Sequence, residues 1–241
     1  MLFKRWLAVS VAGWLLMGCA TSPSPAVARA STTAPAPLDH VSWVQRSAEY
    51  TATVIQTYRM AARRVDEQVA ARPAGTWAVV LDADETVLSN LQYQLERRQS
   101  GYSAESWGAW VRRREATPLP GVRAFLAHVH DRGGRIAIVT NRLQSECADT
   151  EAVFRANALI YDAMLCRADG GPSDKNPRFA AVAEGQTRAG SMPLDVVAFV
   201  GDNILDFPSL TPALRGQPEG AFADFGTRYF MLPNPMYGSW Q

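Results

Sequence analysis

The sequence predicts an α/β fold: a doubly wound, Rossmann-like parallel sheet with N-terminal helices and a small helical cap insertion. Short apolar runs rich in β-branched residues recur along the chain, and helix-like stretches separate them. Acidic or hydroxyl residues stand at the ends of several runs, where doubly wound sheets bind their ligands. With 241 residues, the chain can form one main domain but is short for two. The apolar runs are residues 77–82, 135–140, 162–166, 195–200 and 227–232.

The first residues have the pattern of a lipoprotein signal peptide. Lys4 and Arg5 precede an apolar run that ends at Gly18 and Cys19 and is too short to span a bilayer. Residues 16–19 resemble a bacterial lipobox, in which the Cys is acylated. We expect residues 1–18 to be removed, and Cys19 to carry a lipid that anchors the protein in the bacterial outer membrane, with its folded domain periplasmic or surface-exposed. An ordinary signal peptide with an incidental Cys is the alternative.

Composition divides the remaining chain into a tether and one domain. Residues 19–38 are rich in Ala, Pro, Ser and Thr, so we expect a disordered, lipid-anchored tether. The domain spans residues 39–241 and opens with apolar residues at helical spacing over 39–72, which indicates one or two helices. About fifty residues separate the first two apolar runs. This is more than a crossover needs, so we expect a helical cap at about 90–118.

Charge and cysteine content narrow the expected partners and chemistry. A net charge of +1 provides no broad basic field, so we expect no nucleic acid polymer as a partner. Cys147 and Cys166 follow Cys19, and their spacing matches no metal-binding motif. They can form a disulfide in an oxidising compartment, but two buried free thiols are the interpretation we prefer. Both stay open, because the sequence does not give their geometry.

The strongest local signal for chemistry is a pair of carboxylates, Asp82 and Asp84, at the end of the first apolar run. Two carboxylates one residue apart repel each other unless the site uses them. Asp82 can attack phosphorus as a nucleophile, while a protonated Asp84 donates to the leaving oxygen and later activates water. Taken alone, the motif also fits a solvated acidic turn.

A second acidic pair, Asp202 and Asp206, follows the apolar run 195–200. Residues four apart can converge on one face of a helical turn. Together with Asp82 they would form an all-oxygen site, and oxygen ligands beside a bound phosphate suit Mg²⁺. The sequence therefore predicts Mg²⁺ as the cofactor.

A lysine and a hydroxyl complete the parts that phosphoryl transfer requires. Lys175 is the only Lys beyond the signal peptide, in a chain whose other basic residues are almost all Arg. Thr140 ends the second apolar run, and its hydroxyl can bind phosphoryl oxygens together with the backbone N–H groups of Asn141 and Arg142. These groups would position the phosphate and neutralise its charge.

These motifs resemble the haloacid dehalogenase superfamily and, within it, the bacterial class C acid phosphatases and 5′-nucleotidases, some of them outer-membrane lipoproteins. The resemblance covers essentially the whole mature domain. It is carried by the stretches SAEY at 47–50, LDADETVLSN at 81–90, SWGAWV at 106–111, VTNR at 139–142, DKNPRF at 174–179, VGDNILDF at 200–207 and LPNPMYGSW at 232–240.

The resemblance implies a role for each matching residue. It makes Asp82 the nucleophile and a Mg²⁺ ligand, and Asp84 the general acid and base, with a backbone carbonyl bound to the metal. Asp202 and Asp206 become metal-site carboxylates. The family also implies Thr140 and Lys175 as phosphoryl-binding groups, and Trp107 and Tyr237 as aromatic rings around a base.

Family members hydrolyse small phosphomonoesters, among them nucleoside 5′-monophosphates and nicotinamide mononucleotide, often as homodimers. We therefore expect such substrates, a homodimer, and membrane contact through the lipid anchor only. Two alternatives stay open: a non-catalytic lipoprotein that binds haem or a nucleotide, and a phosphotransferase on the same scaffold. Against the binding lipoprotein stands the complete carboxylate set, since binding alone has no need of Asp84 beside Asp82.

Overall fold

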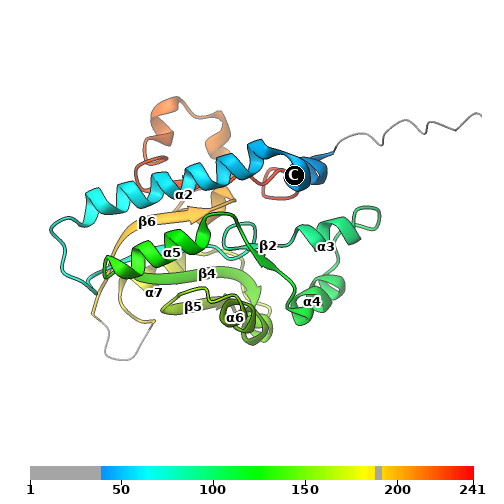
Figure 1. Cartoon of the computed structure of the whole chain (residues 1–241), viewed down its shortest axis with the longest axis horizontal. Coiled ribbons are helices and arrows are strands. Elements are labelled where there is room, and N and C mark those ends of the chain that lie inside the picture. The colour runs from blue at the N-terminus through cyan, green and yellow to red at the C-terminus, as the bar shows by residue number, and fades with distance from the viewer. Residues whose placement is uncertain (1–38, 188–191) are drawn as a thin grey trace, which may run out of the picture. The chain divides into compact units, whose positions relative to one another are not determined.

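The computed structural model of the chain describes residues 39–187 and 192–241 (Figure 1). The expected signal peptide, Cys19 and the tether up to residue 38 lie outside the described residues. Within the described part, none of the helices is both long enough and apolar enough to cross a bilayer.

Five parallel strands form the central sheet in the order β5-β4-β1-β6-β7, which confirms the predicted doubly wound parallel sheet. Each strand coincides with one of the five apolar runs. Strand β1 matters most for the site: it is the middle strand and is buried along its whole length, so its carboxyl end lies at the centre of the sheet edge. The strands are β1 (Trp77–Leu81), β4 (Arg135–Leu143), β5 (Ala163–Arg167), β6 (Asp195–Gly201) and β7 (Tyr229–Met231).

Helices cover both faces of this sheet. Alternate residues of β1 point to opposite faces, as the pleat of a strand requires. Trp77, Val79 and Leu81 belong to the core beneath α2, α5 and α6, whereas Ala78 and Val80 belong to the core beneath α7. The helices are α1 (His40–Arg46), α2 (Ala48–Val69), α5 (Val122–Asp131), α6 (Cys147–Ala156) and α7 (Asn176–Ala183).

An insertion between β1 and α5 forms the cap. Its two short strands, β2 (Leu88–Ser89) and β3 (Thr117–Pro118), pair in antiparallel fashion and enclose α3 (Leu91–Glu96) and α4 (Ala104–Arg113). Figure 1 shows β4 and β6 pointing toward the end of the domain where α3 and α4 lie. The cap therefore stands beside the carboxyl ends of the strands.

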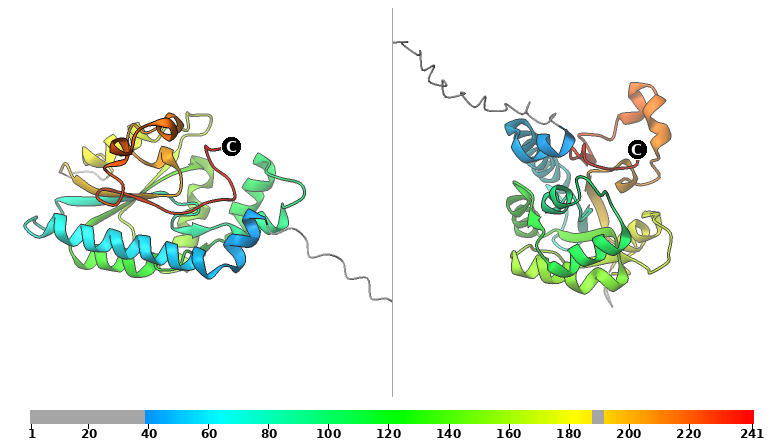
Figure 2. Two further views of the ribbon diagram at one scale, coloured as in Figure 1. Left: turned by 90° about the horizontal axis from the view of Figure 1, so that it is seen from above. Right: turned by 90° about the vertical axis from the view of Figure 1, so that its right-hand side faces the viewer.

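The chain between β6 and β7 contains three short 3₁₀ helices, η2 (Ile204–Asp206), η3 (Pro212–Gly216) and η4 (Glu219–Phe222). After β7, the C-terminal tail returns along the end of the domain that carries α3 (Figure 2). There the Tyr237 hydroxyl donates a hydrogen bond to Glu85, just after β1. The tail thus forms one side of the region at the strand ends.

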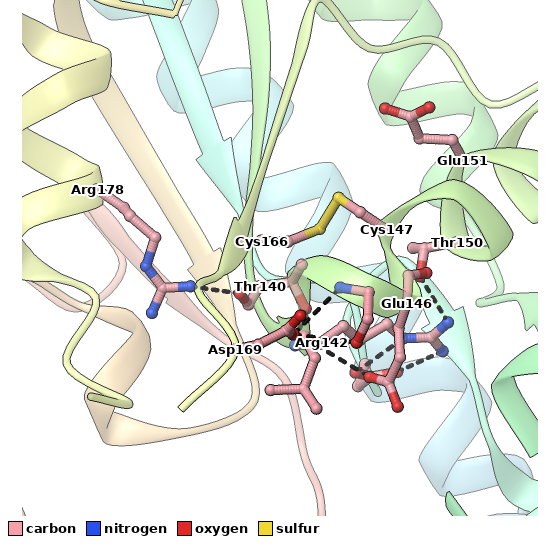
Figure 3. Close-up of a disulfide and its surroundings, with 12 residues drawn as sticks. Thr140, Arg142, Glu146, Cys147, Thr150, Glu151, Cys166, Asp169 and Arg178 are labelled. Carbon is pink, nitrogen blue, oxygen red and sulfur yellow. Dashed lines mark hydrogen bonds and ion pairs between the residues drawn. A yellow bond between two sulfur atoms is a disulfide. The ribbon is translucent and has the colours of Figure 1, made fainter. Parts of the chain in front are cut away.

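Cys147 and Cys166 form a disulfide in the structure (Figure 3). Cys147 is the first residue of α6, and Cys166 lies in β5, with their Cα atoms 6.1 Å apart. This corrects our preference for two free thiols. The pairing arises because β4 and β5 are neighbours, so the chain that leaves β4 begins α6 beside the end of β5.

Candidate active site

Asp82 lies directly after β1, in the middle of the sheet edge, and is only 8% exposed. Its backbone N–H donates to the Val200 carbonyl of β6 at 3.0 Å, which fixes the start of the loop. The Lys175 ammonium, at the start of α7, donates to the Asp82 carboxylate and, at 2.6 Å, to Asp206. Lys175 is itself 4% exposed, so the fold buries this lysine between two carboxylates.

Asp202 joins these two acids at the end of β6. Carboxylate oxygens of Asp82, Asp202 and Asp206 all lie within 4.8 Å of one another. Neutral groups hold Asp202: the Thr86 hydroxyl donates at 3.2 Å and the Asn234 amide at 2.8 Å. The three carboxylates expected at the metal are therefore brought together; Asp84 was expected there only through its backbone carbonyl.

The short turn after β6 explains how Asp206 reaches this cluster. Its second oxygen accepts a hydrogen bond from the Asn203 backbone N–H at 2.9 Å, which closes the first turn of η2. The Asp206 side chain packs over Gly201, where a Cβ atom would collide with it. A glycine directly before Asp202 is thus required by close packing rather than by backbone conformation.

Asp84 is held by a cation and an amide at the edge of the cap. The Arg142 guanidinium donates to both carboxylate oxygens, at 2.7 to 3.2 Å, and the Asn90 amide donates to one of them at 2.8 Å. Arg142 was expected to bind phosphoryl oxygens through its backbone N–H, and its side chain is buried and paired with Asp84. Its role in the structure is to orient Asp84, since a bidentate guanidinium fixes a carboxylate in place.

Glu85 is a buried carboxyl that the sequence did not single out. It has a left-handed backbone with φ of 48° and is 1% exposed. The Asn90 backbone N–H donates to it at 2.7 Å, and the Tyr237 hydroxyl donates to its other oxygen. Burial, together with the nearby charge of Asp84, raises the pKa of Glu85 to about 8. The sequence offered one signal, a third acid in the same turn as Asp82 and Asp84.

Thr140 and its neighbours form a hydrogen-bonded turn at the end of the buried part of β4. Thr140 is fully buried, and its hydroxyl accepts from the Arg142 backbone N–H at 3.1 Å, so that N–H is already engaged. The Arg178 guanidinium donates to the Thr140 carbonyl (Figure 3) and, at 2.6 Å, to the Asn141 side-chain oxygen. Of the three residues expected to bind phosphate or substrate here, Asn141 and Arg142 line the cavity described next. Arg178, whose two hydrogen bonds to Thr140 and Asn141 hold this turn, was not identified from the sequence.

A cavity of about 310 Å³ opens over these residues. Trp107 of α4 and Tyr237 of the tail line it, as expected of aromatic rings near a substrate. Trp110, three residues further along α4, is instead buried and donates its indole N–H to Asn90 at 2.8 Å. The residues that line the cavity are Asp82, Asp84, Gln94, Tyr102, Trp107, Asn141, Arg142, Arg167, Lys175, Asp202, Asn203, Leu205, Asp206 and Tyr237.

The sequence matches the HAD superfamily, subfamily IIIB (Acid phosphatase), over residues 19–240. The chain belongs to this acid phosphatase subfamily. Two solved structures of the class C acid phosphatase from Bacillus anthracis are similar to this acid phosphatase. One has a TM-score of 0.70 and 27% sequence identity, covering 83% of this chain and 84% of that one. The other, with tungstate bound, has a TM-score of 0.70 and 26% identity over the same shares of both chains.

Membership of this subfamily makes the acid phosphatase a phosphoric monoester hydrolase that acts on small phosphate esters, which confirms the predicted reaction class. It also confirms the resemblance on which the residue roles were based. The cavity at the strand ends is the part of the described chain where carboxylates, a lysine and aromatic rings meet.

The acidic cluster of this acid phosphatase fits a divalent metal, which phosphatases of this superfamily typically use. Burial raises the pKa of Asp82 to about 7 against the opposing charge of Lys175, and the Asp206 and Asp84 charges contribute to that value. Burial also raises the pKa of Asp202. When ionised, three carboxylates facing one ammonium leave two negative charges uncompensated. A divalent cation with oxygen ligands matches both that charge and that donor set.

Proposed function

We propose that this acid phosphatase hydrolyses phosphomonoesters through a phospho-aspartate on Asp82, with Mg²⁺ as its cofactor. A carboxylate oxygen of Asp82 attacks phosphorus, and the bond from phosphorus to the ester oxygen breaks. Asp84 gives its proton to the departing alkoxide. Asp84 then removes a proton from water, which attacks phosphorus and releases phosphate, and Asp82 is restored. The observation that carries this proposal is the buried Asp82 with Lys175 bound to it and Asp84 in the same cavity.

The surrounding residues support these steps by holding charge and orientation. Lys175 neutralises part of the charge at Asp82 and keeps its carboxylate in one position. Arg142 and Asn90 fix the direction of the Asp84 carboxyl. We propose Asp82, Asp202 and Asp206, with the backbone carbonyl of Asp84, as the residues that hold Mg²⁺. When bound, the metal would neutralise charge on the phosphoryl oxygens.

For the leaving group we propose nucleoside 5′-monophosphates, with nicotinamide mononucleotide in the same class. Trp107 and Tyr237 line the cavity, and the planar face of a base can stack on aromatic rings with little regard to its identity. Trp107 is already fixed by neighbours, since the Tyr93 ring meets it edge-on with ring centroids 5.2 Å apart. A rigid ring loses little entropy when a base stacks on it.

We also propose that Cys19 is lipidated after removal of residues 1–18, that the protein resides in the outer membrane, and that it forms a homodimer. The family match begins at residue 19, which agrees with a mature chain that starts there. Mass spectrometry of the N-terminal peptide from the membrane fraction tests the lipid. A detergent-corrected light-scattering mass tests the dimer, and a monomeric mass would overturn that part.

The reaction is tested by phosphate release from p-nitrophenyl phosphate and a series of nucleoside 5′-monophosphates, using the full-length protein in detergent. We expect EDTA to abolish turnover and Mg²⁺ to restore it. Asp202→Asn should lose metal-dependent turnover, because Asp202 belongs to the acidic cluster. Asp195→Asn is the matched control, since Asp195 is an exposed acid at the opposite end of β6.

Full activity in EDTA, or an unchanged Asp202→Asn variant, would refute the metal part of the proposal. An added alcohol acceptor separates the two fates of the intermediate: phosphate release independent of the alcohol indicates hydrolysis, and a phosphorylated alcohol as main product indicates a phosphotransferase. Absence of turnover in folded, Mg²⁺-loaded protein would favour the binding lipoprotein instead.

A further inference from the structure

Arg167, the last residue of β5, brings a cation into the cavity that the proposed steps do not use. It lines the cavity together with Asp82 and Lys175, and its side-chain Nε is buried without a hydrogen-bond partner among the described residues. The two other cations of the cavity are paired: Lys175 with Asp82 and Asp206, and Arg142 with Asp84. Arg167 makes no such ion pair within the part of the chain that the structure describes.

The sheet sets Arg167 apart from the position of the reacting phosphorus. β5 is two strands away from β1, and neighbouring strands lie about 4.8 Å apart, so the two strands are separated by about 10 Å. Arg167 pairs in register with Leu143, beyond the level of Thr140. Its neighbour Cys166 is fixed by the disulfide to α6 (Figure 3), so the strand end that carries Arg167 is held in place. The guanidinium therefore enters the cavity from the β5 side, at a distance from Asp82.

The residues around Arg167 favour an anion. Arg178 donates to the side-chain oxygen of Asn141 at 2.6 Å, which leaves the Asn141 amide NH₂ as its hydrogen-bonding group for the cavity. Burial lowers the pKa of Arg178, and the positive charge of Arg167 also lowers it, because the two guanidinium groups are close enough to repel each other. The β4–β5 side of the cavity thus presents donors, whereas the β1–β6 side presents carboxylates.

We propose that Arg167 binds a second anionic group of the substrate, a carboxylate or a phosphate carried by the leaving group. The inference rests on the proposed function, in which the reacting phosphoryl group is bound at Asp82. A guanidinium and an anion form charge-assisted hydrogen bonds of defined geometry. Phosphomonoesters with another acidic group, such as nucleoside bisphosphates or phosphorylated hydroxy acids, are then favoured over esters that differ only in lacking that charge.

The test compares two leaving groups of nearly the same shape. Carboxyphenyl phosphate, with the carboxylate at the 3 or 4 position, is measured against the corresponding carbamoylphenyl phosphate, using full-length protein with Mg²⁺. Arg167→Gln should lower kcat/KM for the better carboxylate ester by about tenfold or more, and for the amide by no more than about threefold. Arg63→Gln, an exposed arginine of α2, is the control for loss of one charge and should change neither.

Equilibrium binding separates this inference from the proposed function. The non-hydrolysable phosphonates of the same pair are titrated by calorimetry into wild type and Arg167→Gln. A selective loss of affinity for the carboxylate supports the role of Arg167 even if no ester is turned over, in which case only the proposed function fails. Equal losses for carboxylate and amide would mean that Arg167 contacts the reacting phosphoryl group. Either that result or no loss at all overturns the inference.

Discussion

Asn90 connects the acids of the cavity to the cap through one buried side chain. Its amide nitrogen donates to Asp84 at 2.8 Å and to Glu85 at 3.2 Å. Its oxygen accepts from the Trp110 indole at 2.8 Å and from Arg142 at 3.2 Å. Because Asn90 is completely buried, removal of its amide would leave the buried groups of Glu85, Trp110 and Arg142 without this partner and without water in its place.

We predict that Asn90→Ala lowers kcat by about tenfold to a hundredfold, because Asp84 loses one of the two groups that orient it. Steady-state kinetics with p-nitrophenyl phosphate measure this. Trp110→Phe is the matched control: it removes a different hydrogen bond of Asn90 and leaves Asp84 untouched. It should cost roughly 1 kcal/mol of stability and change kcat by less than about threefold. Equal kinetic effects of both variants would mean that Asn90 acts only through packing.

Trp107 gives a second prediction, about specificity. If a base stacks on this ring, Trp107→Leu raises KM for nucleoside 5′-monophosphates by about tenfold. The same variant should leave KM for glycerol phosphate nearly unchanged, since that ester has no aromatic group. The ratio of the two KM values is the measurement. A parallel rise for both substrates would indicate that Trp107 shapes the cavity rather than binds a base.

The sequence was sufficient to identify site residues that directly follow strands. It was insufficient to identify those whose partners come from distant parts of the chain. Asp82 and Asp202 are readable because each comes directly after an apolar run, and parallel strands end at a common edge. Asn90 and Arg178 act through partners that are brought close only by folding, such as Arg142 on β4. The pairing of the Arg142 side chain with Asp84 could not be predicted, because nothing local in the sequence reveals it.

The five strands of the central sheet were predictable in number and order of appearance, but not in length, and the two short cap strands β2 and β3 were not predicted. β4 continues to Leu143 although its apolar run ends at Thr140, because its pairing with β5 is irregular after Val139 and resumes at Leu143. β7 covers only Tyr229–Met231, since it is an edge strand that pairs with β6 alone. Hydrophobic pattern marks the buried part of a strand, whereas its ends depend on hydrogen bonds to neighbours.

The disulfide between α6 and β5 gives a prediction at this level. Cys147 and Cys166 are 19 residues apart, and closing a loop of that length restricts the unfolded chain. We expect Cys147→Ser/Cys166→Ser to lower the free energy of unfolding by about 3 kcal/mol, measured by chemical denaturation. Reductant should lower the free energy of unfolding of the wild-type protein by a similar amount and leave that of the double variant unchanged. The pairing would be contradicted if reductant destabilised the double variant, or if the double variant had the same denaturation midpoint as the wild-type protein.

The buried acids make the stability of the whole domain depend on pH and metal. Burial raises the pKa of Asp82 to about 7, whereas an unfolded Asp titrates near about 4. The folded, metal-free protein therefore binds protons more tightly than the unfolded chain. The protonated Asp82 therefore contributes to the free energy of unfolding in full below about pH 4, and this contribution is lost as the pH rises through about 7. The raised pKa values of Asp202 and Glu85 act in the same direction.

From this linkage we predict that Mg²⁺ raises the unfolding temperature more at pH 8 than at pH 5. At pH 8 the metal binds carboxylates that would otherwise repel one another, and at pH 5 it must displace protons. Thermal unfolding of full-length protein with Mg²⁺ or EDTA at both values measures the shift. Asp202→Asn should reduce the shift, and Asp195→Asn should keep it. A larger shift at pH 5 would show that the cluster does not bind the metal.

Phosphoryl transfer through Asp82 is tested by trapping the phosphorylated protein. Full-length enzyme turning over a radiolabelled phosphate ester with Mg²⁺ is quenched in acid within milliseconds, and the labelled peptide is identified. We predict a hydroxylamine-sensitive label on the peptide that contains Asp82, and none in Asp82→Asn. Label on another residue, or turnover that persists in Asp82→Asn, would show that Asp82 is not the nucleophile.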